Sequence, residues 1–327
     1  MDHLRVLVLS TFPPTRCGLA TFSRDLISAM EQSANGLALQ TAVAAIDREG
    51  VHFGRTDRIA CTVNPDRVEN YRNLANFVNR SHFDVVCLQH EYGLFGGDWG
   101  EHLLEFLRRC EKPVVSVCHT VMEDPPAKAV SVLQEVARHS TAIVVMAGAA
   151  IDMLGKYYRI RGENIAVIPH GVPQFRFGNR ATIKEQFGLL GKQVIATFGL
   201  VSRGKGLEYM IKAMRSVLAR NPDAVYVIVG QTHPGVQAKE GESYRRELQA
   251  LADTLPNPQA VQFVNRFVRV SEIGEYLQAT DVYVTPYLSY NQITSGTLSF
   301  ALAAGKAIVS TPYIHANEAL AHGRGIL

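Results

Sequence analysis

Residues 285–310, TPYLSYNQITSGTLSFALAAGKAIVS, decide the fold of this chain. An apolar strand ends at Thr285, and a polar loop covers residues 291–297. The small residues of Leu298–Ala304 then predict a helix that lies close to a sheet, and Gly305 leads into a second apolar strand. This order predicts a β-α-β unit of a parallel sheet.

The start of the expected helix is suited to an anion. Thr294 or Ser295 is a natural N-cap, and Gly296 removes side-chain bulk. Because the first N–H groups of a helix have no intrahelical acceptor, those of Ser295, Gly296 and Thr297 are candidate ligands for a negative group. Taken alone, the stretch is equally consistent with an ordinary crossover helix.

A second strand-turn-helix pattern lies about ninety residues earlier. The turn Val201–Gly206 carries Arg203 and Lys205, and an amphipathic run begins at Leu207. Glycines allow close backbone approach, and a lysine supplies a mobile charge for phosphate. The turn has neither the Walker spacing nor the Gly-x-Gly-x-x-Gly of dinucleotide sites. Two such turns at the ends of parallel strands predict a bound diphosphate; the alternative is a solvated loop.

Length and composition narrow the class of protein. A chain of 327 residues exceeds the usual single core, so two domains are expected. The net charge of +3 is too small to indicate nucleic acid as a partner. The cysteines form no Cys-x-x-Cys pair, which favours free thiols in a reducing, cytoplasmic compartment. No stretch approaches transmembrane length, so only peripheral membrane contact stays open, as does the oligomeric state.

Short apolar runs rich in Val and Ile alternate with helical patterns, as in sheets buried on both faces. Strands are expected at Val6–Leu9, Leu39–Ala45, Val85–Leu88, Val114–Cys118, Ala142–Val145, Ile165–Ile168, Val194–Phe198, Val225–Val229, Val261–Val264, Val282–Thr285 and Ala307–Ser310. The helical patterns between them include Thr21–Met30, Glu101–Arg109, Leu207–Arg220, Tyr244–Leu255 and Ser271–Gln278. A break after Ile168 predicts two doubly wound, Rossmann-like domains, 1–172 and 173–327, facing across a ligand cleft.

Five segments together resemble the family-4 glycosyltransferases (glycosyl transferases group 1), retaining sugar-nucleotide enzymes of the GT-B fold. In chain order they are the Gly-bearing turn 13–22, Val117–Val121, Ile168–Val172, Ser202–Gly206 and Leu298–Val309. The resemblance covers essentially the whole chain. It implies an α/β protein of two Rossmann-like domains, the first on the acceptor side and the second binding the nucleotide-sugar donor.

The resemblance also implies roles for single residues. Gly18 lies in the turn that faces the donor, and His119 is in the place of a histidine that reaches the donor sugar. Lys205 takes the place of the lysine that binds the diphosphate. Asn291 and Gln292 are candidates for hydrogen bonds to the donor sugar.

The chain departs from the family pattern at several positions. Gln292 and Phe300 stand where the family has two glutamates, the second of which binds the ribose. Leu200 replaces an arginine, whose charge Arg203 would supply instead. The family's C-terminal helices are missing after a strand pattern begins at Ile326, so a fragment is expected.

Two further clusters follow predicted strands. His90, Glu91 and Tyr92 are expected to bind an acceptor, because carboxylates grip sugar hydroxyls and aromatic faces stack on sugar rings. The alternative for this segment is a mobile surface loop. Arg266 and Phe267 lie where a nucleotide base is expected. No His-Glu-x-x-His pattern is present, so neither a metal nor a cofactor is expected.

The resulting hypothesis is a cytoplasmic hexosyltransferase that moves a sugar, with retention, from a nucleotide-diphosphate-sugar to a carbohydrate or small hydroxylated acceptor. His119, Lys205 and Arg203 are the candidate catalytic residues. One rival is a sugar-1-phosphate-dependent phosphorylase of the same fold. Another is a catalytically impaired sugar- or nucleotide-binding relative or fragment, which Phe300 would suit.

Overall fold

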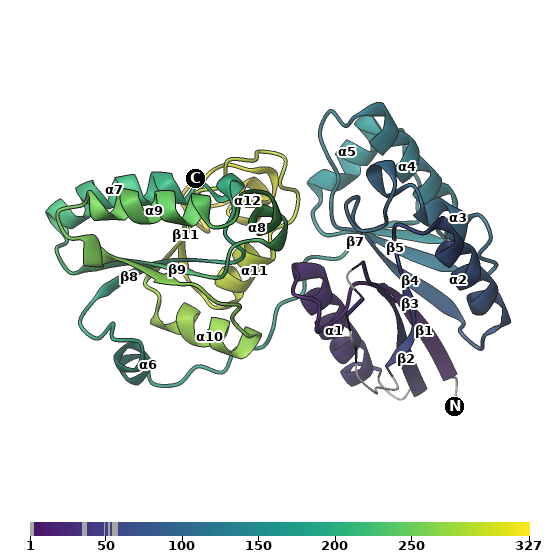
Figure 1. The fold of residues 1–327 in the computed structure, drawn as a ribbon, viewed down its shortest axis with the longest axis horizontal. Helices are drawn as coiled ribbons and strands as arrows, with labels where there is room; N and C mark the ends of the chain where they lie inside the picture. The colour runs from purple at the N-terminus through teal and green to yellow at the C-terminus, as the bar shows by residue number, and fades with distance from the viewer. Residues whose placement is uncertain (1–2, 35–37, 49, 52, 54–57) are drawn as a thin grey trace. The chain divides into compact units, whose positions relative to one another are not determined.

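The computed structural model describes residues 3–34, 38–48, 50–51, 53 and 58–327. The chain divides into two compact units, Met1–Pro169 and His170–Leu327. Each unit is built on a parallel sheet with helices on its faces (Figure 1). Because the strands are parallel, every connection between neighbours crosses over the sheet, and most crossovers contain a helix.

The first unit contains a parallel sheet in the order β3-β2-β1-β4-β5-β6-β7. Its strands are β1 (His3–Ser10), β2 (Ala38–Ile46), β3 (Ile59–Val63), β4 (Val85–His90), β5 (Val114–Cys118), β6 (Ala142–Val145) and β7 (Ile165–Val167). Its helices are α1 (Gly18–Gln32), α2 (Val68–Arg80), η1 (Asp98–Gly100), α3 (Leu103–Leu107), α4 (Ala127–Arg138) and α5 (Ala149–Tyr157).

The second unit contains a parallel sheet in the order β10-β9-β8-β11-β12. Its strands are β8 (Gln193–Phe198), β9 (Ala224–Val229), β10 (Val261–Val264), β11 (Val282–Thr285) and β12 (Ala307–Ser310). Its helices are α6 (Arg180–Gln186), η2 (Arg203–Lys205), α7 (Leu207–Arg220), α8 (Pro234–Glu240), α9 (Ser243–Asp253), η3 (Pro258–Ala260), α10 (Val270–Ala279), α11 (Gly296–Ala303) and α12 (Ile314–Ala319).

Alternate residues of β9 enter two different cores of the second unit. Val225, Val227 and Val229 belong to the core that includes residues of α10 and α11. Tyr226 and Ile228 belong to the core that includes residues of α7 and α9. Figure 1 shows α7 and α9 together over one face of the sheet and α10 on the other. This double burial explains why the strand reads as a continuous apolar run.

In each sheet, the strand order reverses at one point. β1 lies between β2 and β4, and β8 lies between β9 and β11. Open α/β sheets bind ligands at the carboxyl ends of the strands beside such a point. In the second unit, this places the loops that follow β8 and β11 at the expected ligand edge.

The expected strands are confirmed. The structure differs from the sequence-based expectation in its helices and at the edge of the first sheet, where β3 lies. The linker 173–179 leads into α6, which the sequence reading missed; the Asn179 side chain caps it by accepting from the amides of Ala181 and Thr182. β3 was also missed. The helix expected at 101–109 is shorter, because η1 precedes it with Trp99 at a φ of 58°. At the other end of the chain, Ile326 pairs with Val309 of β12 in an isolated parallel bridge.

None of the helices in the described ranges has the length and apolar character that a membrane-spanning segment needs.

Candidate functional site

Two glycines shape the turn that follows β8. Gly199 has a φ of +127°, and Gly206 has a φ of +60° just before α7. A Cβ on Gly206 would fall 2.1 Å from the carbonyl oxygen of Pro286, so only glycine fits between η2 and the loop after β11. The turn therefore packs directly on the segment that begins the expected donor loop.

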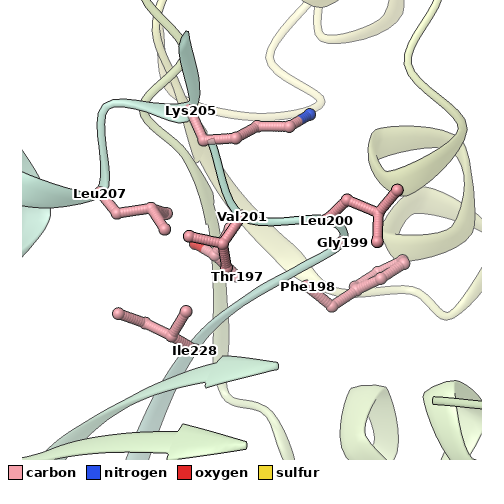
Figure 2. Close-up of a pocket in the computed structure, with 8 residues that line it drawn as sticks. All are labelled: Thr197, Phe198, Gly199, Leu200, Val201, Lys205, Leu207 and Ile228. Carbon is pink, nitrogen blue, oxygen red and sulfur yellow. The ribbon is translucent and has the colours of Figure 1, made fainter. Parts of the chain in front are cut away.

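Lys205 ends η2 beside a small hollow at the carboxyl end of β8. The residues that line this hollow are Thr197, Phe198, Gly199, Leu200, Val201, Lys205, Leu207 and Ile228. Figure 2 shows the Lys205 amine directed away from Leu207. Its Nζ lies 3.8 Å from the centre of the Tyr287 ring. The lysine is thus held by an aromatic face, which leaves its N–H groups for another ligand.

Arg203, two residues earlier, is engaged elsewhere. Its guanidinium lies 2.7 Å from a Glu247 carboxylate oxygen and 2.9 Å from one of Glu240. It also lies 4.9 Å from the centre of the Tyr244 ring. These partners come from α8 and α9, so in this structure Arg203 braces those helices against the turn.

Ser295 is the N-cap of α11, as expected, and its Oγ accepts from the amide of Leu298 at 3.3 Å. Its own amide N–H is already used, because it donates to Nδ1 of His315 at 2.9 Å. The amides of Gly296 and Thr297 have no acceptor among the described residues. Of the three amides expected to receive an anion, these two remain available.

Tyr287 joins the two turns. Its hydroxyl lies 2.7 Å from Oγ1 of Thr297, while its ring carries the Lys205 ammonium group. The amide of Leu288 also donates to the carbonyl oxygen of Gly204 at 3.0 Å. The turn Val201–Gly206, here called the cationic turn, is about ninety residues from the start of α11 in sequence. Through Tyr287 the two segments nevertheless lie together and form one constellation of possible ligand-binding groups.

The polar loop 291–295, which leads into α11, directs its two candidate donor ligands differently. Asn291 is exposed. The Gln292 side chain turns inward and donates to the carbonyl oxygen of Thr294 at 2.8 Å. The backbone carbonyl of Gln292 accepts from the amide of His315 at 3.1 Å. The histidine thus holds the loop at two points, Gln292 and Ser295.

Phe300 lies in an aromatic cluster. Its ring centre lies 6.1 Å from that of Phe198, 5.9 Å from that of Phe175 and 6.3 Å from that of His170. A carboxylate would be poorly solvated in these surroundings. The packing accounts for an apolar residue at this position of α11.

Arg266 and Phe267 follow β10 at the edge of the second sheet. The Arg266 guanidinium pairs with Glu272 at 2.6 Å, and Phe267 is exposed. Their part in binding a base stays a prediction.

In the first unit, the ends of β4 and β5 are tied together. Nε2 of His119 lies 2.8 Å from Oε1 of Gln89, and the His119 amide donates to the carbonyl oxygen of His90 at 3.0 Å. The hydroxyl of Thr120 donates to Glu91 at 2.6 Å. Burial raises the pKa of the Glu91 carboxyl, and the hydrogen bonds from Thr120 and the Tyr92 amide oppose that shift.

Gly18 begins α1 beside this cluster, and a Cβ there would meet open space. Phe22 of the same helix lies edge-on to the His119 ring, with centroids 4.8 Å apart. The Cys17 thiol caps the helix by accepting from the amide of Ala20 at 3.3 Å. The structure therefore brings α1, β4 and β5 together around His119.

His90 and Tyr92 are buried beneath this cluster rather than presented at the surface. His90 has no exposed surface, and among the described residues neither of its ring nitrogens has a hydrogen-bond partner. Burial lowers its pKa to about 4. The Tyr92 hydroxyl donates to Tyr158 at 3.3 Å. Of the three expected acceptor ligands, only Glu91 is partly exposed.

Sequence reasoning did not select Tyr287 or His315. Both lie within a few residues of a strand end, in the loop after β11 and at the start of α12. That position was a usable signal, although their partners are not visible in the sequence. Within the described part of the chain, no group of three or more His, Cys, Asp or Glu side chains is arranged to hold a metal ion.

Comparison with known proteins identifies the family. The model described as Glycosyltransferase Family 4 matches residues 29–174, and the model described as Glycosyl transferases group 1 matches residues 192–327. The chain belongs to this family of glycosyltransferases.

Two curated relatives match shorter parts of the chain. The protein YtcC of Bacillus subtilis is 30% identical over 132 residues, which are 40% of this chain and 31% of that protein. The D-inositol 3-phosphate glycosyltransferase of Segniliparus rotundus is 30% identical over 105 residues, 31% of this chain and 23% of the relative. The matched part of this chain thus spans less than a third of either relative.

Solved structures match nearly the whole chain. Anabaena HepE in complex with UDP and glucose aligns with a TM-score of 0.76 at 16% identity, covering 99% of this chain and 85% of that one. Sucrose-phosphate synthase of Thermosynechococcus elongatus aligns with a TM-score of 0.76 at 14% identity, with the same coverage. The expected GT-B fold of two Rossmann-like domains is confirmed.

Proposed function

We propose that this chain transfers a sugar, with retention, from a nucleoside diphosphate sugar to a hydroxyl group of a carbohydrate or other small acceptor. The observation that carries the proposal is the constellation around Tyr287, where Lys205 meets the start of α11. One mobile cation and the available amides of Gly296 and Thr297 suit a diphosphate. HepE, whose fold is similar, was solved with UDP and with UDP-glucose, which supports this donor class.

These groups would act on the leaving diphosphate. As the bond between the sugar and the phosphate oxygen breaks, negative charge grows on the phosphate and positive charge grows on the sugar ring. Groups fixed in place stabilise the growing negative charge without reorganising, and loss of one such donor typically costs about 3 kcal/mol of barrier. The acceptor oxygen then bonds to the sugar carbon on the face that the phosphate leaves, and its proton passes to the phosphate.

His119 and Glu91 are the groups that we assign to the sugar and the acceptor. The His119 ring is oriented by Gln89, and Glu91 is oriented by Thr120. An imidazole and a carboxylate held in this way can hydrogen-bond sugar hydroxyls. We expect no metal or cofactor requirement, so EDTA should leave activity unchanged. The five free cysteines support a reducing, cytoplasmic location.

The proposal is tested by titrating the protein with UDP, GDP, ADP and inorganic pyrophosphate in a calorimeter. We expect binding of pyrophosphate and of at least one nucleotide, and we expect Lys205→Ala to weaken both about tenfold or more, because it removes a charged donor. NMR of the anomeric proton of the transferred sugar then checks retention. The proposal would be refuted if the protein bound none of these four ligands.

A second candidate function is nucleotide-sugar binding without turnover, and the packing of Phe300 favours it. The aromatic cluster leaves no carboxylate at this position of α11. This candidate predicts nucleotide binding that depends on Lys205, with no release of nucleotide from any donor sugar. A phosphorylase would instead bind a sugar 1-phosphate in preference to nucleotides.

A further inference from the structure

His233 is anchored next to the cationic turn. Its amide donates to the carbonyl oxygen of Val201 at 2.9 Å, and the amide of Val201 donates to the carbonyl oxygen of Gln231 at 2.9 Å. Val201 and Thr232 form a parallel bridge beyond the ends of β8 and β9. The loop after β9 therefore runs alongside the segment that leads into η2 and Lys205.

The tautomer of His233 is set by its second contact. Its Nδ1 accepts from the amide of Gly235 at 3.0 Å and so caps α8. In the neutral ring, the proton therefore lies on Nε2, for which no acceptor is found among the described residues. Burial and then the charge of Lys205 lower the pKa of His233, which favours the neutral ring with Nε2 as a donor.

A buried polar network holds this loop in place. Thr232 is 1% exposed, and its hydroxyl donates to Glu242 at 2.5 Å. The side chain of Arg245 is 11% exposed, and it pairs with Glu242 at 3.2 Å and donates to the carbonyl oxygen of Gly230 at 2.8 Å. Burying the polar groups of an arginine and a threonine costs free energy unless hydrogen-bond partners are fixed in place. The network therefore holds the backbone at Thr232 rigidly, and with it the next residue, His233.

We propose that His233 is a second donor to the diphosphate, acting beside Lys205 through its Nε2–H. The geometry fixes one ring nitrogen on α8 and leaves the other for a ligand at the same sheet edge as the cationic turn. This inference rests on the proposed function and adds to it a residue from the loop after β9. Thr232, Glu242 and Arg245 act through His233 and are positioning residues.

The test is His233→Asn. An asparagine oxygen takes the place of Nδ1 and is a favoured helix cap, so α8 keeps its cap while the Nε2–H is lost. We expect about tenfold weaker binding of inorganic pyrophosphate and of UDP in a calorimeter, as for loss of a hydrogen bond to a charged group. Binding of uridine, which lacks phosphate, should not change. His233→Gln carries an amide N–H to the place of Nε2 and should recover part of the pyrophosphate affinity.

The controls separate this inference from the proposed function. His322→Asn makes the same change at an exposed histidine after α12 and should leave pyrophosphate binding unchanged. If Lys205→Ala weakens pyrophosphate binding and His233→Asn does not, His233 only caps α8 and the inference is overturned while the proposed function stands. If the unmodified protein binds neither pyrophosphate nor any nucleotide, both are overturned.

Discussion

The ammonium group of Lys205 lies 3.8 Å from the centre of the Tyr287 ring, over the face of the tyrosine. The same tyrosine is 3% exposed and contacts Thr297 through its hydroxyl. A single side chain thus sets the distance between a cation on one turn and the first residues of α11. Removing parts of Tyr287 one at a time should separate these two effects.

Tyr287→Phe keeps the ring and removes the hydroxyl, whereas Tyr287→Leu removes both. We expect Tyr287→Phe to weaken pyrophosphate binding about threefold, because it loses the contact with Thr297. We expect Tyr287→Leu to weaken it about tenfold, because it also loses the aromatic face, which contributes roughly 0.5–2 kcal/mol to holding the lysine. Calorimetric titration measures both variants, below the melting temperature of each. Equal affinity of Tyr287→Leu and the unmodified protein would show that Lys205 needs no such support.

Two glycines in the same turn should differ in how strongly alanine destabilises the protein. In Gly206→Ala the new Cβ meets the carbonyl oxygen of Pro286 at 2.1 Å in a left-handed backbone, whereas at Gly204 a Cβ meets nothing within 4 Å. We expect Gly206→Ala to lower the free energy of unfolding by about 2 kcal/mol or more and Gly204→Ala to change it by less than about 0.5 kcal/mol. Urea unfolding followed by circular dichroism measures both. Similar stabilities for the two variants would contradict the packing of Gly206 on Pro286.

His315 should order the loop 291–295 through its Nδ1. Asparagine offers an oxygen at the same place and leucine has a similar size without an acceptor, so the pair isolates the hydrogen bond from the Ser295 amide. We expect His315→Leu to weaken nucleotide binding about tenfold, because a buried N–H is left without an acceptor and the loop is released. His315→Asn should stay within about threefold of the unmodified protein. If both variants bind nucleotide equally well, the contact does not order the loop.

The first unit should lose stability in acid. Burial lowers the pKa of His90 to about 4, so between the ordinary value near 6.5 and about 4 the unfolded chain binds a proton that the folded chain does not. The stabilisation is present above pH 6.5 and is lost as the pH falls toward 4, by up to about 1.4 kcal/mol per pH unit. The only tryptophan, Trp99, lies 5.4 Å from the Tyr92 ring, so its fluorescence during urea unfolding reports on this unit.

His90→Leu removes that titration without removing a described hydrogen bond, since neither ring nitrogen has a partner in the part of the chain that the structure describes. We expect its unfolding free energy to depend less on pH between 4.5 and 6.5 than that of the unmodified protein. His82→Leu makes the same change at an exposed histidine and should keep the original slope. An unchanged slope in His90→Leu would mean that His90 is accessible to protons in the folded protein.

The strands could be predicted from the sequence because a strand that is buried on both faces consists of consecutive apolar residues. β5, β6, β10, β11 and β12 have the expected limits. α6 was not readable, because most of its residues are polar and none of them is fully buried. There the helix depends on the Asn179 cap and on the pairing of Arg180 with Asp281, which is distant in sequence.

The candidate site was predictable to the level of its turns and no further. Both turns, with Lys205 and the Ser295 cap, follow from local patterns. The partners do not: Arg203 pairs with Glu247, and the Ser295 amide pairs with His315. Such contacts depend on how helices pack, and a local pattern carries no information about them. These contacts occupy the Arg203 guanidinium and the Ser295 amide, so fewer of the predicted groups are available to a ligand.

One close approach limits how this region can be redesigned. A Cβ on Gly230 would fall 2.0 Å from the carbonyl oxygen of Gly199, where the backbones that leave β8 and β9 nearly touch. A library randomised at position 230 alone should return glycine almost exclusively among folded clones. Any effort to widen this edge for a bulkier ligand would therefore have to move both backbones together, and single-site evolution at position 230 has no stepwise route to that goal.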